Sequence, residues 1–297
     1  MNDRELIEQL QLIAAEQRDG LSLYCLLDST VYAAASTDEM GKSYGDLAAE
    51  LIGAKAEPLF AYAFNDARAD ASPLLVSIPA LEGDLAAQIA ALAVRYHLAS
   101  WVWSPLSRQV LAQHFARFIR AEFGATAAIL RPYDPRIMED TIACFDFGRQ
   151  AALWRPLSAW SYLDEDDVLK QLQRPVWEPA SELSCPLRLD RNEQDRFEGL
   201  ANRIALAGYI EAHGPSIMES LTSAERKAFC IQQLEIGERL GKRSMGDLFI
   251  VAALSGAHGV QWIDDTRVGH LVQSVTAGNV SLAAVAAEIG GRLEQRG

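Results

Sequence analysis

The fold depends on residues 127–136, which read Ala-Ala-Ile-Leu-Arg-Pro-Tyr-Asp-Pro-Arg. The first half of this stretch is a short apolar run of the kind that forms a buried strand. That strand must end near Pro132, because proline has no N–H to donate to a sheet. The second half predicts a helix start, with Asp134 capping free backbone N–H groups and Pro135 at the first helical position. The stretch therefore predicts a strand-to-helix corner.

Such a corner brings four side chains together at the C-terminal end of a strand: Arg131, Tyr133, Asp134 and Arg136. Ligands and partners of open α/β sheets are bound at such strand ends. A structural interpretation stands beside this one, in which Arg136 pairs with Asp140, Asp134 only caps the helix and Tyr133 covers the sheet edge. Taken alone, the residues favour the structural role.

Strand-like runs alternate with helices in the first part of the chain, which predicts an α/β layer with at least part of the sheet parallel. The predicted strands are Leu21–Asp28, Pro58–Phe64, Pro73–Ile78, Ser100–Trp103, Ala127–Arg131 and Leu153–Tyr162. The predicted helices are 3–18, with a capping box from Asn2 and Glu5, then Tyr44–Ile52, Asp84–His97, 104–122 and Asp134–Cys144.

The pattern changes after residue 164. An acidic run and three prolines predict a linker with extended pieces over residues 165–189. Helices are predicted for about 190–212, 222–240, 244–256, 264–277 and 281–295. We therefore expect an α/β N-terminal lobe over residues 1–164, with a mixed, partly parallel sheet flanked by helices, and an all-helical C-terminal lobe over residues 190–297.

Composition excludes several classes of protein. The chain has 297 residues and a formal net charge of −13, which argues against a nucleic-acid binder and against a surface that lies on anionic lipid. The four cysteines (Cys25, Cys144, Cys185 and Cys230) have no CxxC spacing, so we expect reduced thiols and neither a zinc site nor disulfides. The first residues lack the apolar core of a signal peptide, and no apolar run could span a bilayer, so a cytoplasmic location is expected.

Signals for catalysis are weak. Residues 41–45 match the G-x-S-x-G pattern around a nucleophilic serine, Ser43, but the polar segment before them makes a poor core strand. Residues 237–243 have one residue too few between glycines for a phosphate-binding loop, and they predict a helix C-terminus with Gly241 as its cap.

The acidic run Asp164–Asp167 is more typical of a turn or a helix start than of a metal site. The five histidines show no metal-binding spacing, and His114 is expected to pack on an apolar helix. We therefore expect no catalytic set, no metal and no cofactor. Trp101 and Trp103 are more typical of a core than of a recognition surface, although exposed tryptophans do anchor interfaces. They are kept with the corner residues as candidates for partner binding or for positioning the corner.

The string Arg131-x-Tyr133-Asp134-Pro135-Arg136 resembles the Arg-aromatic-Tyr-Asp-Pro-Arg signature of adaptor proteins that carry the domain of unknown function 4123. Three other stretches are similar to that family in order and spacing, and the similarity covers about residues 21–160. They are Leu23–Asp28, Pro73–Val76 and Ser104–Leu106, the last followed by a helix bearing His114, Phe115 and Phe118. The chain departs from the family pattern at Pro132, where an aromatic residue is usual, and at Ser29 and Thr30.

The resemblance implies a type VI secretion adaptor, or effector chaperone. Such proteins bind a toxic effector in the cytoplasm and help to load it onto the VgrG spike. The expected partner is therefore a cognate effector, with the spike as a second candidate partner, and neither nucleic acid nor a membrane is expected. Two alternatives remain open: a serine-dependent hydrolase that uses Ser43, and an immunity-type protein that neutralises a toxin.

Overall fold

The structure, a computed structural model, describes residues 1–28, 56–64, 72–124, 126–175 and 183–294. The chain divides into two compact units, residues 1–196 and 197–297, and the boundary falls inside the long helix α9 (Arg191–His213). The predicted linker 165–189 contributes two strands to the first unit, which therefore extends well beyond residue 164.

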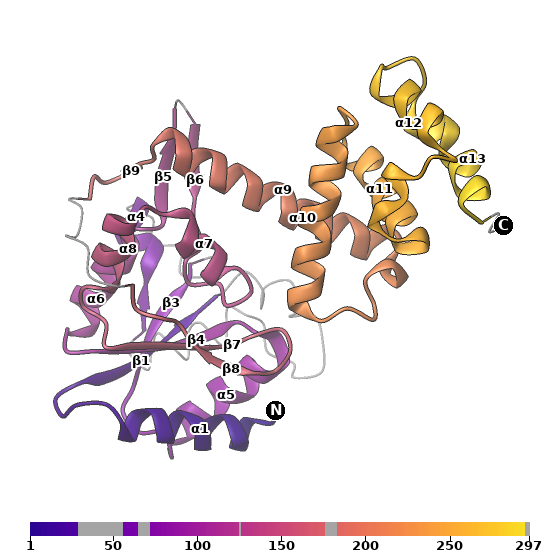
Figure 1. Cartoon of the computed structure of the whole chain (residues 1–297). Coiled ribbons are helices and arrows are strands. Elements are labelled where there is room, and N and C mark those ends of the chain that lie inside the picture. The colour runs from indigo at the N-terminus through magenta and orange to yellow at the C-terminus, as the bar shows by residue number, and fades with distance from the viewer. Residues whose placement is uncertain (29–55, 65–71, 125, 176–182, 295–297) are drawn as a thin grey trace. The chain divides into compact units, whose positions relative to one another are not determined.

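A six-stranded sheet forms the centre of the first unit, in the order β2-β3-β1-β4-β7-β8 (Figure 1). Every neighbouring pair in it is antiparallel. Its strands are β1 (Ser22–Leu27), β2 (Glu57–Pro58), β3 (Leu74–Ile78), β4 (Ala99–Ser104), β7 (Ala159–Leu163) and β8 (Leu169–Gln171). The central strand β4 is buried along its whole length, Ser100 and Ser104 included, so its apolar residues do not alternate with exposed polar ones.

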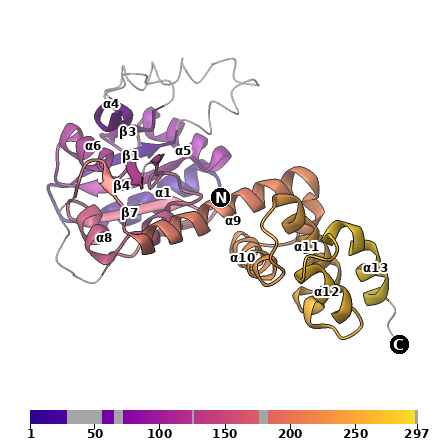
Figure 2. The same ribbon diagram turned by 90° about the horizontal axis from the view of Figure 1, so that it is seen from above.

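Helices cover both faces of this sheet. The face that carries Cys25 and Trp101 packs against α1 (Asp3–Ala15) and α5 (Asp84–Tyr96). On the opposite face, the ring of Trp160 contacts Phe115 of α6 (Arg108–Ala116) and Trp154 of α8 (Phe147–Trp154). The short helix α4 (Leu59–Phe64) packs beside α6 (Figure 2).

A second sheet of three strands completes the first unit, in the order β6-β5-β9. β5 (Arg120–Phe123) pairs antiparallel with β6 (Thr126–Ile129) and parallel with β9 (Leu187–Arg188). This is the one parallel pairing among the described strands. The expected mixed α/β lobe is thus confirmed, but the parallel contribution comes from the small sheet.

Several predicted boundaries were wrong, for local reasons. Residues 59–64 form helix α4 and not a strand, since only Glu57 and Pro58 pair with β3. The helix predicted over 104–122 ends at Ala116, and β5 follows it. Of the strand predicted over 127–131, only residues 127–129 belong to β6 (Thr126–Ile129), which is mostly exposed at the edge of the small sheet and is not a buried strand. Residues 153–154 end helix α8, and β7 begins only at Ala159. The predicted helix Tyr44–Ile52 lies outside the described residues.

The second unit is helical, as the sequence predicts. Beyond α9 it contains α10 (Ser223–Arg239), α11 (Met245–His258), α12 (Gly269–Thr276) and α13 (Leu282–Glu294), with short 3-10 turns at Pro215–Ile217 and Val260–Asp264. A capping box from Thr222 and Glu225 begins α10, and Gly241 follows its end with a positive φ of 67°, as expected for a helix C-terminus. The indole of Trp262 is buried and donates a 3.0 Å hydrogen bond to Ser255 Oγ.

No helix in the described ranges combines the length and the apolar character required to cross a bilayer.

Helices α10 and α11 approach each other closely at Gly237. A Cβ atom built there lies 2.3 Å from Leu248 Cδ2 and 2.9 Å from the Lys242 carbonyl oxygen. We expect Gly237→Ala to lower the free energy of unfolding of the helical unit by about 1–3 kcal/mol, because the added methyl group must displace one of these neighbours. Gly246→Ala, in α11, is the matched control, since its Cβ meets no atom within 4 Å. Urea unfolding of the full chain, followed by circular dichroism, tests this; equal midpoints for the two variants would contradict it.

Candidate functional site

The predicted corner does bring its four residues together. β6 ends at Ile129, and residues 131–137 form two successive turns before α7 (Met138–Cys144) begins. The Asp134 N–H donates to the Arg131 carbonyl at 3.2 Å, and the Ile137 N–H donates to the Asp134 carbonyl at 3.0 Å. These turns place the Arg131, Asp134 and Arg136 side chains within reach of one another.

Asp28 is the residue that the sequence reasoning missed. It directly follows β1 and is only 1% exposed, as is Asp134. Arg131 pairs with Asp28 through Nη2, and the same nitrogen lies 3.2 Å from Asp134 Oδ2. Arg136 binds Asp134 with two nitrogens, Nε and Nη2, each at 2.9 Å, and its Nη2 lies 3.4 Å from Asp28 Oδ2. We call these four residues the corner cluster.

The cluster is electrically neutral, with two carboxylates and two guanidinium groups. Burial disfavours charge on Arg131, but the Asp134 and Asp28 carboxylates outweigh it and raise the pKa of Arg131. Burial and the Asp28 carboxylate raise the pKa of Tyr133, which keeps this buried phenol neutral. The cluster therefore balances its own charges. Its Arg131–Asp28 pair also links the connection between β6 and α7 to the end of β1, more than one hundred residues earlier in the sequence.

Two expectations about the corner need correction. Asp134 does not cap a helix, because α7 begins four residues later at Met138; it accepts the Arg136 N–H at 3.2 Å and so closes a turn. Arg136 pairs with Asp134 and Asp28, whereas Asp140 was the partner expected.

The two candidate tryptophans are core residues. Trp101 and Trp103 lie on β4, each only 2% exposed, and they pack with α1 and α5. Their burial removes the exposed surface that a partner-binding role requires.

A groove of about 650 Å³ lies elsewhere on the first unit. It is bounded by α7, α8, the end of β8 and the start of α9, with an apolar floor and a polar rim. The floor residues are Ile142, Phe145, Trp154 and Leu172, and the rim residues include Glu139, Asp146, Gln150, Gln171, Gln173, Asp190, Asn192 and Arg196. The Phe147 side chain, which is 69% exposed, also lines the groove.

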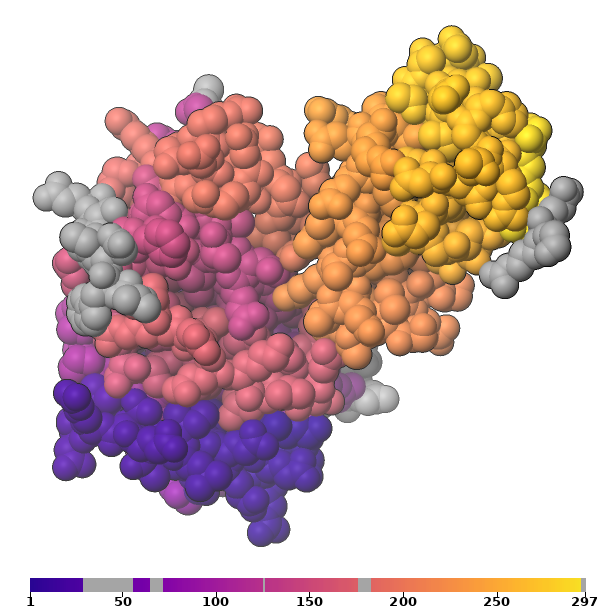
Figure 3. All heavy atoms as spheres, viewed as in Figure 1, coloured from indigo at the N-terminus to yellow at the C-terminus, as the bar shows by residue number. Residues whose placement is uncertain are grey.

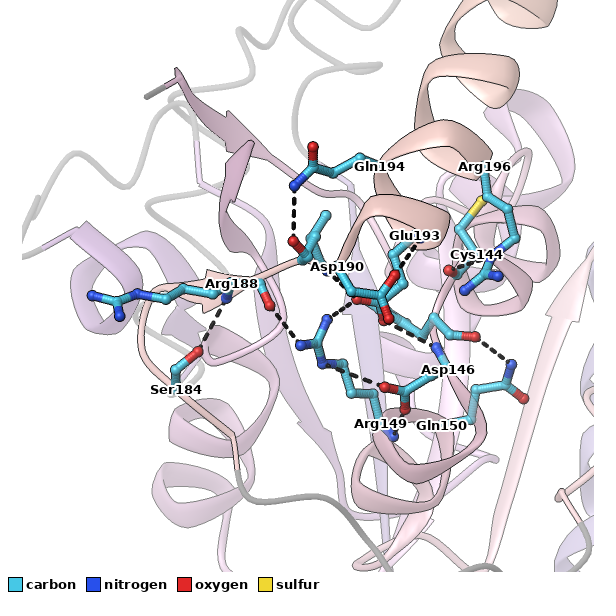
Figure 4. A network of polar contacts seen from close by, with 12 residues as sticks. Cys144, Asp146, Arg149, Gln150, Ser184, Arg188, Asp190, Glu193, Gln194 and Arg196 are labelled. Atoms are coloured by element: carbon cyan, nitrogen blue, oxygen red, sulfur yellow. Dashed lines mark hydrogen bonds and ion pairs between the residues drawn. The ribbon is translucent and has the colours of Figure 1, made fainter. Parts of the chain in front are cut away.

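Carboxylates hold the starts of α8 and α9 together beside this groove (Figure 4). Asp146 caps α8 by accepting the Arg149 N–H at 2.7 Å, and Asp190 accepts the Glu193 N–H at 2.8 Å. The buried Glu193 accepts the N–H groups of Asp146 and Asp190 at 3.0 and 2.9 Å. Sequence reasoning missed this network, although Asp-x-x-Glu at 190–193 is a capping pattern.

The same three carboxylates have oxygens within 4.8 Å of one another, close enough to share a metal ion. Arg149, however, pairs with Glu193 and lies 4.0 Å from Asp146 Oδ2, so a guanidinium already supplies the positive charge there. The arrangement is a helix-capping network compensated by one cation.

Comparison with known proteins adds one assignment. Residues 23–152 match the family described as Domain of unknown function (DUF4123). The chain carries a DUF4123 domain. No curated protein and no solved structure matches the chain.

The DUF4123 domain contains the whole corner cluster, from Asp28 to Arg136. It also contributes α7 and most of α8 to the groove, while β8 and α9 lie beyond its matched end at residue 152. The groove is therefore built where the DUF4123 domain meets the segments that follow it.

The other motifs show ordinary structural roles where they are described. Ser43 lies outside the described residues. Asp164 begins the turn between β7 and β8 and accepts the N–H groups of Asp166 and Val168, and its carboxylate pairs with Lys170 at 2.7 Å. All four cysteines are free, as expected, with only Cys185 exposed.

His114 in the DUF4123 domain packs on an apolar helix, as expected. Its ring contacts Phe115 and Phe118, and Nε2 lies 2.9 Å from the Leu153 carbonyl oxygen, so Nε2–H is the donor. Burial lowers the pKa of His114 to about 4. The hydrogen bond to the Leu153 carbonyl acts in the opposite direction and offsets only part of this effect.

The first test of the site concerns the charges of the corner cluster. We expect Asp28→Asn to lower the free energy of unfolding by about 3–5 kcal/mol, because it leaves two partly buried guanidinium groups with one carboxylate. Adding Arg131→Gln to this variant should recover about 1–3 kcal/mol of the loss, as the double-mutant cycle of a coupled pair requires. Urea unfolding of the full chain measures both. Additive effects, or a loss no larger than that of Glu8→Gln in the exposed Arg4–Glu8 pair, would show that the cluster is not coupled.

A second test uses the pH dependence of stability. His114 is neutral in the folded chain down to about pH 4, whereas the unfolded chain binds a proton near pH 6.5. The contribution of His114 to the free energy of unfolding is thus fully present above pH 6.5. It decreases by at most about 3 kcal/mol as the pH falls toward 4. We expect His114→Gln, which retains an amide donor, to flatten this part of the curve of unfolding free energy against pH. Parallel curves for the two proteins would contradict the assignment.

Proposed function

We propose that this chain is a non-catalytic, cytoplasmic adaptor or chaperone that binds a type VI secretion effector and helps to load it onto the VgrG spike. The DUF4123 domain over residues 23–152 is the observation that carries the proposal. The Arg-x-Tyr-Asp-Pro-Arg string that resembles the adaptor signature lies inside this domain, where it forms the corner cluster.

The physical character of the first unit supports a role in binding polypeptide. Its groove has an apolar floor, a rim of amide and carboxylate side chains, and an exposed phenylalanine. Such a surface suits a segment of another protein, because apolar contacts supply affinity while rim charges select the partner and its orientation. The formal charge of −13 favours association with a client that has basic regions.

The corner cluster has a positioning role in this proposal. Asp28 and Asp134 are buried and paired, so they hold the connection between β6 and α7 in place and do not themselves face a partner. Because α7 forms one wall of the groove and directly follows this connection, the cluster fixes the start of that wall.

The proposal is tested in the native host. Proteins that co-purify with the tagged full chain are identified by mass spectrometry and compared with the products of neighbouring genes, which names the candidate effector. We expect deletion of the adaptor gene to abolish secretion of that effector while secretion of unrelated type VI effectors continues, and we expect the intact gene to restore it.

Three results would contradict the proposal. Unchanged effector secretion in the deletion strain would remove the adaptor function. Neutralisation of the toxin inside the producing cell, with delivery unaffected, would indicate an immunity protein. Labelling by a fluorophosphonate probe that disappears in Ser43→Ala would indicate a serine hydrolase.

A further inference from the structure

β8 is the last strand of the six-stranded sheet, and its register shows which backbone groups face outward. The Leu172 N–H donates to the Trp160 carbonyl at 2.8 Å, and Lys170 lies opposite Tyr162. In an antiparallel pair, alternate residues direct both backbone groups at the neighbouring strand. Lys170 and Leu172 therefore face β7, and the N–H and C=O groups of Leu169, Gln171 and Gln173 point away from the sheet. Among the described residues, no hydrogen-bond partner is present for these outward groups.

This open edge borders the groove. Gln171, Leu172 and Gln173 line it opposite α7 and α8, and Leu172 lies on the same sheet face as Trp160. In Figure 3 the surface of the β7–β8 segment lies beside that of α7 and α8 on this face of the first unit. A row of unpaired backbone groups next to an apolar floor is the arrangement that accepts an added strand, with backbone bonds giving affinity and pockets for alternate side chains giving specificity.

The charges on the groove restrict the kind of strand. Three carboxylates line it (Glu139, Asp146 and Asp190) against one guanidinium, that of Arg196, which leaves a formal charge of −2. The Arg196 Nε donates to the Cys144 carbonyl at 2.9 Å, which holds this guanidinium beside α7, and the three carboxylates outnumber it on the lining. An acidic segment would be repelled, whereas lysine or arginine side chains would complement the rim.

We infer that the groove binds an extended segment of the client as an additional strand along β8, with both apolar and basic residues among the alternate side chains that face the groove. This inference rests on the proposed adaptor function and specifies the surface and the chemistry of its partner. The strand bonds to Leu169, Gln171 and Gln173, its apolar side chains pack over Ile142 and Phe145, and its basic side chains lie near Glu139 and Asp190.

Residue-resolved hydrogen exchange on the full chain, with and without the co-purifying effector, tests this pairing. We expect the amides of Gln171 and Gln173 to exchange rapidly in the free chain and at least tenfold more slowly in the complex. The amides of Lys170 and Leu172, which face β7, should be protected in both states. Unchanged exchange at Gln171 and Gln173 in a complex that does form would overturn the inference while leaving the adaptor function standing.

A backbone substitution provides the second measurement. Gln171→Pro removes one outward N–H and leaves the bonds to β7 in place, and proline is tolerated at such edge positions. We expect it to weaken effector binding about tenfold or more, through one lost hydrogen bond and the unpaired acceptor on the client. Gln171→Thr, which keeps the N–H and a strand-forming side chain, should bind within about twofold of the wild type. Equal binding by the two variants would overturn the inference.

The charge requirement is tested by Asp190→Asn, which keeps the helix cap, and by Glu139→Gln. Each should weaken binding a few-fold at low salt and have no effect near 1 M salt, where the Debye length is about 3 Å. Tiled peptides from the effector should bind when positions i, i+2 and i+4, which face the groove, include both apolar and basic residues, and binding only by acidic peptides would contradict the assignment. If no effector co-purifies at all, the adaptor function itself fails and this inference falls with it.

Discussion

The corner cluster is the constraint on which the first unit depends. Asp28 and Asp134 are buried carboxylates, and such groups are stable in a protein interior only when paired and hydrogen-bonded. Arg131 and Arg136 supply that compensation from a single short connection. This charge pairing therefore fixes the positions of three chain segments: the end of β1, the end of β6 and the start of α7. It does so although Asp28 and Arg131 are far apart in the sequence.

The consequence for function is geometric. α7 leaves the cluster at Met138 and forms a wall of the groove with Ile142. A second polar network, centred on Glu193 and Arg149, fixes the opposite side by joining the starts of α8 and α9. The corner cluster balances its own charges, whereas the second network sets one guanidinium, that of Arg149, against three carboxylates. What remains for a partner is the apolar floor between them, the acidic rim and the outer edge of β8.

The layer architecture was predictable because local patterns decide it. Short, mainly apolar runs predicted β1, β3 and β4, and helical periodicity with caps predicted α1, α5 and the helices after residue 190. The local sequence also suggested the right roles for His114, packed on an apolar helix, and for Gly241, at a helix C-terminus; the hydrogen bond from His114 to Leu153 of α8 was not predicted.

The features that were not predicted depend on contacts between residues far apart in the sequence, which local sequence patterns do not show. Residues 127–129 look like a core strand, yet β6 lies at the edge of a small sheet, because β5 is its only strand partner in the described chain. Arg136 has Asp140 four residues away, but its carboxylates are Asp134 and the distant Asp28. Trp101 was kept as a candidate for partner binding although its sequence context favoured the core, and it is a core residue, since α1 and α5 cover its face of the sheet. The groove could not be foreseen, because it joins segments on both sides of residue 152.

The client is proposed to bind along the outer edge of β8. Site-specific photo-crosslinking in living cells tests this claim most directly. A benzophenone amino acid is placed at Gln173, on the groove, and in a matched strain at Leu12, which is 69% exposed on α1. Irradiation should link the secreted effector to the chain from position 173 and not from position 12. Crosslinks of equal yield from both positions, or none from position 173 while the effector still co-purifies, would contradict the account.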